Sequence, residues 1–145
     1  MDKQKKVIGT LEKVEFPKFK IDNTIAKIDT GAYTGALHCT KIKEISKDGE
    51  SVLAFSPFDH PSITIRTKDF STRFVKSSNG QRERRYLIKT DIKIQGKTYD
   101  IVLSLANRRG MKWEVLIGRR FLRNNHFLVD VKRGHEYLEQ HRSKL

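Results

Sequence analysis

The sequence predicts an all-β fold, a closed barrel built from short strands. Most of the 145 residues fall into short segments that alternate polar and apolar side chains or stay apolar for a few positions, which is the pattern of β-strands. Pairs that favour tight hairpin turns, Asp48-Gly49 and Asn79-Gly80 among them, separate these segments. Helical patterns are few, so about ten short strands joined by turns predict a barrel.

The strands of the first half lie on either side of the Asp48-Gly49 turn. Each is a short run in which apolar side chains recur at strand spacing or follow one another directly. The expected strands cover residues 6–16, 24–29, 36–45, 51–58 and 62–67. The Asp48-Gly49 pair fits a tight hairpin between the third and the fourth of them.

In the second half, Asn79-Gly80 and Gln95-Gly96-Lys97 mark two further hairpin turns. The strands expected around them cover residues 72–76, 84–94, 98–105, 114–117 and 127–131. A short helix is predicted over residues 119–124, and the polar tail over residues 135–143 has a helical pattern. No internal repeat or linker divides the chain, so we predict a single domain over residues 1–145.

The N-terminus and the cysteine content predict a compartment. Residues 1–6 are charged and polar, without the apolar run of a signal peptide or a membrane helix. Cys39 is the only cysteine, so no internal disulfide is possible, which suits a reducing environment. We therefore expect a cytoplasmic protein that does not enter the membrane, with Cys39 as a small buried residue.

The charge of the chain is strongly positive. Thirty Lys and Arg residues against seventeen Asp and Glu residues give a formal net charge of +13. Such an excess attracts anions, so the partner of this surface is nucleic acid, an acidic protein segment or simply solvent. The arginines, whose planar guanidinium suits carboxylate and phosphate alike, gather in clusters. These clusters are Arg82, Arg84 and Arg85; Arg108 and Arg109; and Arg119, Arg120 and Arg123.

Asp29-Thr30-Gly31 is the motif that carries chemistry. It follows an apolar run, which puts a carboxylate on a tight turn that leaves a strand. Gly31 lets the backbone fold close enough for its amide to reach the carboxylate, and the Thr30 hydroxyl can tie the turn to a neighbour. Two such carboxylates facing each other share one proton, as in aspartic proteolysis. The chain has one copy, so the motif indicates either a homodimer or no protease.

A second motif strengthens this interpretation. Residues 115–117 form another apolar run that leads into Gly118-Arg119 and a short amphipathic turn of helix. This ordered pair of motifs resembles the retropepsins, the retroviral-type aspartic proteases, in whose fold the second strand packs beside the catalytic loop. The resemblance implies a closed barrel with a flap hairpin, expected here over residues 74–86, and one short helix after the Gly-Arg motif.

Further positions are similar to one bacterial retropepsin-like family, whose members have long been labelled ATP-dependent zinc proteases. These positions are Asp29 to Ala32, Thr34, Leu37, His38, Ser78 to Gly80, Arg85, Leu103 to Leu105, Asn107, Arg108, Met111 and Leu116 to Arg119. The resemblance implies Asp29 as the catalytic carboxylate, braced by Thr30 and Gly31, and leaves His38 without an assigned role. Members of this family often accompany ATP-grasp enzymes that attach glutamate to proteins, which implies such a ligase as a functional partner.

One position departs from the viral pattern. Viral retropepsins carry an acidic residue where this chain has Thr34, and that acid pairs with the arginine of Gly-Arg. Arg119 therefore either finds another carboxylate or faces the substrate. With the basic flap, this gives a predicted set of residues that bind an acidic, glutamate-rich polypeptide: Arg82, Arg84, Arg85, Arg108 and Arg119.

The sequence predicts neither a metal nor a cofactor. His135 and His141 flank a glutamate but are six residues apart, whereas a zincin helix needs two histidines four residues apart. No glycine-rich phosphate loop is present. We therefore predict a homodimeric aspartic peptidase.

Two alternatives from other classes stay open. One is a basic nucleic-acid-binding barrel that stacks bases on aromatic side chains, although strand spacing favours core positions for most of them. No known RNA- or DNA-binding signature supports it. The other alternative is a catalytically inactive retropepsin-like interaction module.

Overall fold

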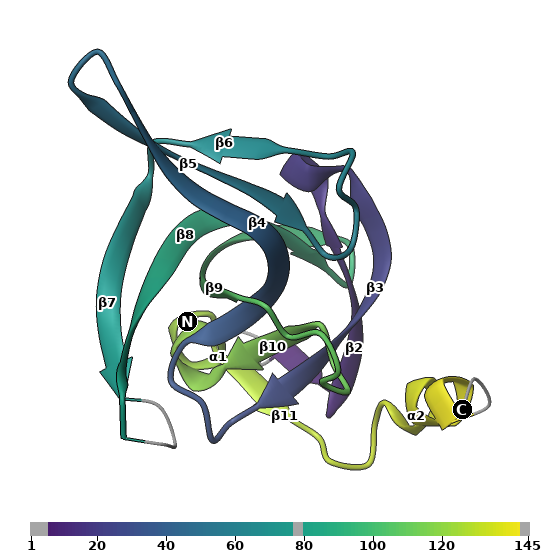
Figure 1. The fold of residues 1–145 in the computed structure, drawn as a ribbon. Helices are drawn as coiled ribbons and strands as arrows, with labels where there is room; N and C mark the ends of the chain where they lie inside the picture. Colours follow the sequence, from purple (N-terminus) through teal and green to yellow (C-terminus); the bar gives the residue numbers. More distant parts are fainter. Residues whose placement is uncertain (1–5, 77–79, 143–145) are drawn as a thin grey trace.

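A ring of strands forms the body of the protein in the computed structural model, which describes residues 6–76 and 80–142 (Figure 1). The order around the ring is β10 (Val115–Gly118), β3 (Ile21–Asp29), β2 (Leu11–Phe16), β8 (Arg82–Ile94), β9 (Lys97–Ala106) and β4 (Gly35–Lys47). The ring closes because β4 also pairs antiparallel with β10. This arrangement confirms the predicted all-β, barrel-like fold.

The remaining elements extend or flank the ring. Strands β5 (Glu50–Pro57) and β6 (Ile65–Thr67) continue the sheet beyond β4, and β7 (Phe70–Lys76) forms a hairpin with β8. A separate parallel pair joins β1 (Lys6–Ile8) to β11 (Phe127–Val129). The helices are the short turn η1 (Pro17–Phe19), α1 (Arg119–Asn124) directly after β10, and α2 (His135–Arg142). Within the described part of the chain, no helix is long and apolar enough to cross a membrane.

The strand predicted over residues 6–16 is in reality two strands in two sheets. The chain turns at Gly9, where a side chain would lie 2.8 Å from the backbone of Arg133. The amide of Thr10 donates to the Arg133 carbonyl oxygen at 3.0 Å. This contact with a distant segment diverts β1 toward β11 before β2 begins, and no local pattern announces it.

The barrel interior is filled by aliphatic and aromatic side chains from all parts of the ring. The largest fully buried apolar side chains are Phe16, Phe55, Ile8, Leu37, Leu53, Ile92, Ile94, Leu103, Ile117, Val14 and Val115. Phe58 and Trp113 are also buried, while the Phe74 side chain is 58% exposed. Most of the aromatic residues are therefore core residues, as their strand spacing predicted.

Cys39 is the free cysteine of this core. It is fully buried, and burial raises the pKa of its thiol well above the ordinary range. The thiol is therefore protonated at neutral pH and shielded from reagents, which confirms the expected small buried residue.

Candidate active site

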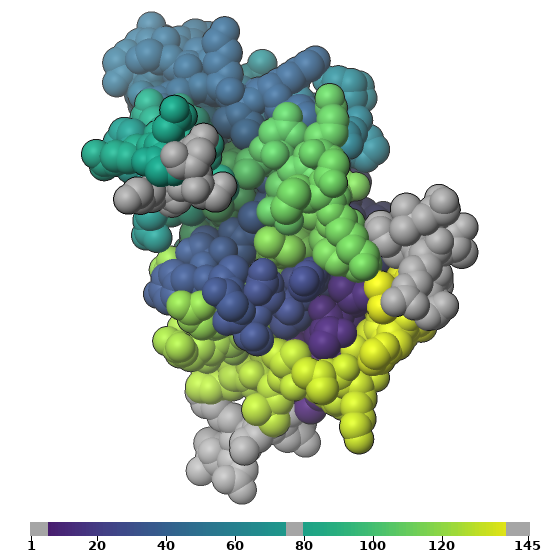
Figure 2. All heavy atoms as spheres, turned by 60° about the horizontal axis from the view of Figure 1, so that its bottom comes forward, coloured from purple at the N-terminus to yellow at the C-terminus, as the bar shows by residue number. Residues whose placement is uncertain are grey.

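The two sequence motifs lie side by side at one end of the barrel. Strands β3 and β10 run parallel in a register that places Gly118 opposite Asp29. Gly118 is required by the contact, since a Cβ there would lie 2.6 Å from the Tyr33 carbonyl oxygen. In Figure 2, the blue segment between β3 and β4 lies on this face beside the green segment that follows β9, with the teal β7–β8 hairpin nearby.

The turn after β3 holds the carboxylate of Asp29 by a bond from its own backbone. The Gly31 amide donates to Asp29 Oδ1 at 3.0 Å, as the sequence predicted. The Ala32 amide donates to the Asp29 carbonyl oxygen at 3.2 Å and completes the turn. Asp29 is half-buried, whereas Thr30 and Gly31 are exposed. The loop therefore presents a fixed carboxylate at the surface of the single chain.

Arg119 holds this loop through its carbonyl oxygens. Its Nη1 donates to Gly31 O at 3.1 Å and lies 3.4 Å from Thr30 O. Its guanidinium also lies over the Tyr33 ring, 5.5 Å from the ring centroid. Arg119 has no acidic partner at position 34 and bonds instead to backbone carbonyl oxygens. Its side chain thereby supports the Asp29 turn directly.

Arg108 brings positive charge toward Asp29 from the segment that follows β9. Its Nε donates to the Trp113 carbonyl oxygen at 3.0 Å, and the side chain is half-buried. Burial and the nearby Arg85 lower the pKa of Arg108, while the Asp29 carboxylate raises it. An arginine side chain does not lose its proton in proteins, so Arg85 and Arg108 both carry a positive charge. Arg108 therefore lies within electrostatic reach of both the Asp29 carboxylate and Arg85.

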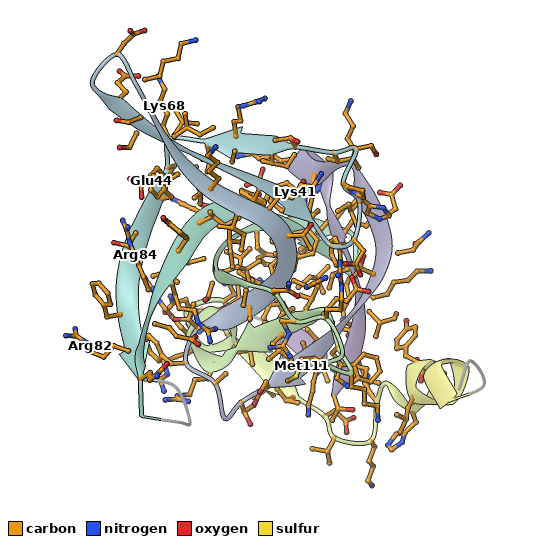
Figure 3. All side chains as sticks on the ribbon, in the orientation of Figure 1. Lys41, Glu44, Lys68, Arg82, Arg84 and Met111 are labelled. Carbon is orange, nitrogen blue, oxygen red and sulfur yellow. The ribbon has the colours of Figure 1, made fainter. Side chains whose placement is uncertain are left out.

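The three arginines of the predicted flap lie on different faces of the hairpin. Successive residues of a strand point to opposite faces, so Arg85 is separated from Arg82 and Arg84. Arg84 donates to Glu44 Oε1 at 3.0 Å, and Arg82 lies over the Phe74 ring at 4.8 Å. Figure 3 shows Arg82 and Arg84 at the outer edge of the hairpin, away from the centre of the barrel. The turn of the predicted flap, residues 77–79, lies outside the described residues.

Sequence reasoning gave no role to His38 and missed Asp59. The His38 ring accepts a hydrogen bond from the Arg108 amide and lies 3.0 Å from an oxygen of Asp59. The pKa of Asp59 is lowered by hydrogen bonds from His38 and then from Arg109. A histidine within the family-like pattern was the available signal for the first residue. Asp59 sits in an irregular loop, and nothing in its local sequence marks it.

The acidic and metal-binding residue types do not gather into a cation site in residues 6–76 and 80–142. No group of three or more His, Cys, Asp or Glu side chains there has an arrangement that could hold a metal ion.

Comparison with known proteins identifies similar chains. Residues 7–140 match the family model RimB-like, described as retropepsin-like aspartic endopeptidase RimB. A probable alpha-L-glutamate ligase of Desulfotalea psychrophila is 34% identical over 125 residues, which cover 81% of this chain and 26% of the ligase. A probable alpha-L-glutamate ligase of Shewanella pealeana is 34% identical over 137 residues, covering 90% of this chain and 29% of the ligase. The chain thus spans less than a third of these curated relatives.

A solved structure has a similar fold. The crystal structure of a protein of unknown function from Legionella pneumophila superimposes with a TM-score of 0.64 at 25% sequence identity. The superposition covers 88% of this chain and 94% of that chain.

Proposed function

This chain belongs to the RimB-like family of retropepsin-like aspartic endopeptidases, and from that premise we propose that it is an aspartic peptidase that acts as a homodimer. The observation that carries the proposal is the Asp29 turn. Its carboxylate is oriented by the Gly31 amide, its loop is supported by Arg119, and it lies beside Gly118 of the second motif. A carboxylate held in this way at a surface is suited to meet a second copy of itself.

Two Asp29 carboxylates, one from each subunit, would enclose one water molecule. The ionised carboxylate takes a proton from the water as its oxygen attacks the peptide carbonyl carbon, and the protonated carboxylate polarises the carbonyl oxygen. When the tetrahedral intermediate collapses, the C–N bond breaks and the amine leaves with a proton. One carboxylate cannot take both roles, and the chain supplies one Asp-Thr-Gly, so the second must come from a partner.

The substrate we propose is an acidic, glutamate-rich polypeptide. The +13 net charge supports this, as does Arg108, whose charge interacts with the Asp29 carboxylate. The similarity to a segment of proteins named probable alpha-L-glutamate ligase supports it from a second direction, because a ligase of that name produces glutamate-linked products. We propose that the peptidase works in the cytoplasm beside such a ligase and hydrolyses polypeptides rich in glutamate.

The test is hydrolysis of an oligo-glutamate peptide by the purified protein and by Asp29→Asn. The wild type should release shorter peptides, and Asp29→Asn should release none while keeping the same circular dichroism spectrum. Asp91→Asn is a matched control, because Asp91 pairs with Lys18 and lies away from the turn. Undiminished hydrolysis by folded Asp29→Asn would refute the proposal.

A further inference from the structure

His38, on β4, is a buried polar residue whose backbone and ring are all hydrogen-bonded. Its backbone amide donates to Glu114 O at 2.8 Å, and its carbonyl oxygen accepts from the Phe58 amide at 2.8 Å. Its ring Nδ1 lies 2.8 Å from the Arg108 amide, and its Nε2 lies 3.0 Å from Asp59 Oδ1. The side chain is 1% exposed. One residue of β4 thus joins the segment after β5 to the segment after β9.

The hydrogen bonds fix the protonation of the ring. A backbone amide can only donate, so Nδ1 must be the unprotonated acceptor, and Nε2 must carry the proton. That proton is donated to Asp59, whose carboxylate also accepts from Arg109 Nη2 at 3.2 Å. The neutral imidazole is thereby held in a single tautomer, with an ionised carboxylate on its far side.

The residue held by Nδ1 is Arg108. Its amide is bonded to His38 and its Nε to Trp113 O, so both ends of the residue are fixed. Its carbonyl oxygen accepts from the Met111 amide at 2.8 Å, which closes the turn around it. The outcome is a half-buried guanidinium within electrostatic reach of Asp29. A buried side chain that fixes a charged residue in this way reduces the freedom lost when that charge binds an anion.

We propose that His38 is the positioning residue of the substrate site and that Asp59 sets its tautomer. In this role the neutral imidazole holds Arg108 so that its guanidinium binds a side-chain carboxylate of the substrate beside the scissile bond. The inference rests on the proposed peptidase function, which it deepens by assigning acidic-side-chain recognition to the His38–Arg108 pair. Because Arg108 binds the substrate before and during the reaction alike, His38 acts on KM rather than on kcat.

Two substitutions separate the hydrogen bond from the volume of the ring. His38→Leu introduces an apolar side chain of similar size and removes both ring hydrogen bonds, to the Arg108 amide and to Asp59. His38→Asn keeps a hydrogen-bond acceptor near the position of Nδ1, so its KM for the acidic peptide should stay close to the wild-type value. His60→Leu is a matched control, since His60 is an exposed histidine next to the Asp59 segment. Circular dichroism and the melting temperature verify that each variant is folded.

The expected result is a KM for an oligo-glutamate peptide about tenfold higher in His38→Leu, because a charge-assisted contact is mispositioned. The KM for a neutral peptide should be unchanged, and kcat should hold for both peptides. In an Arg108→Ala background, His38→Leu should add little. Equal effects on acidic and neutral peptides would show a general structural role and overturn the proposal.

Two readouts do not depend on hydrolysis. In the Asp29→Asn background, calorimetry should show weaker binding of the uncleaved oligo-glutamate peptide after His38→Leu, and equal binding would overturn the inference even if the peptidase proposal stands. In the wild type, ¹⁵N chemical shifts of the His38 ring should report a proton on Nε2. A proton on Nδ1 would overturn the inference, including in the event that His38→Leu fails to fold.

Discussion

Gly118 lies in the close contact between the Gly118-Arg119 motif and the loop that follows Asp29. A Cβ at this position would lie 2.6 Å from Tyr33 O and 2.9 Å from Ala32 O, so β10 would have to move away from the Asp29 loop. We expect Gly118→Ala to lower the free energy of unfolding by about 2 kcal/mol and to abolish hydrolysis. Urea unfolding and the oligo-glutamate assay measure the two effects.

A glycine in open space is the control for this substitution. Gly96 has φ +81° and no atom near its missing Cβ, so Gly96→Ala strains only a remote hairpin turn. Its unfolding free energy should fall by about 1 kcal/mol with hydrolysis retained. If Gly118→Ala retained full hydrolysis as well, the close contact between the motifs would not be needed for the site.

Asp59 gives a prediction about pH. Hydrogen bonds from His38 and then Arg109 lower the pKa of this carboxyl in the folded state. A lowered folded pKa means that ionised Asp59 stabilises the fold above its unfolded pKa, and that this stabilisation is lost as the pH falls through the folded pKa. Asp59→Asn should therefore unfold more easily than the wild type at pH 7.

The difference between the two proteins should shrink as the pH falls below about 4, near the ordinary value for aspartate. Urea unfolding followed across this range measures it. A difference that stayed constant from neutral to acid pH would indicate that the Asp59 charge contributes nothing to the stability of the fold.

Residues differ in how far their roles could be predicted. The Gly31 amide bond to Asp29 follows from three consecutive residues, so the sequence was sufficient. The partners of Arg119 are carbonyl oxygens, and every residue type carries one, so no sequence pattern marks them. The role of His38 depends on segments brought together only by the closed barrel.

At the scale of elements, the β7–β8 hairpin separates arginines that are neighbours in sequence. Arg85 interacts with Arg108 and bonds to Glu83 on its own strand, whereas Arg84 bonds to Glu44 on β4. We expect Arg85→Ala to raise the KM for an acidic peptide about tenfold, since a positive charge that interacts with Arg108 of the proposed substrate site is lost. Arg84→Ala removes the same charge from the opposite face of the β7–β8 hairpin. It should raise this KM less, because only the long-range attraction of the peptide is weakened.

Steady-state kinetics with acidic and neutral peptides test this pair of variants. Equal KM values for Arg84→Ala and Arg85→Ala would mean that the face of the hairpin does not matter. The separation was available in the sequence, because residues 84 and 85 of a strand must point to opposite faces. The break between β1 and β2 could not be predicted from the sequence, since it depends on the contact of Gly9 with Arg133.

At the scale of the whole molecule, the net charge of +13 affects how substrates arrive. Dissolved salt screens charges over about 10 Å at 0.1 M, so attraction to a distant acidic peptide should weaken as salt is added. The KM for oligo-glutamate should rise between 50 mM and 500 mM NaCl, while the KM for a neutral peptide should change little. A salt response that is identical for both peptides would contradict an acidic substrate.

The barrel itself was the most predictable feature of the molecule. Strand-period patterns and hairpin turns mark most of its strands, and the resemblance of the two motifs to the retropepsins implied the pairing of β3 with β10. The oligomeric state is harder to predict from the sequence, because it depends on a surface that a single chain leaves exposed. In the single chain Thr30 and Gly31 are exposed, while β1 pairs with β11 of the same chain.

The central claim is that two chains each supply one Asp29 to a shared site. It is tested most directly by mixing wild-type protein with folded Asp29→Asn at a constant total concentration and measuring oligo-glutamate hydrolysis. If both subunits must supply the carboxylate, an equal mixture should show about a quarter of the wild-type rate, because mixed dimers are inactive. A rate that stays proportional to the amount of wild-type chain, about one half in that mixture, would contradict a shared site.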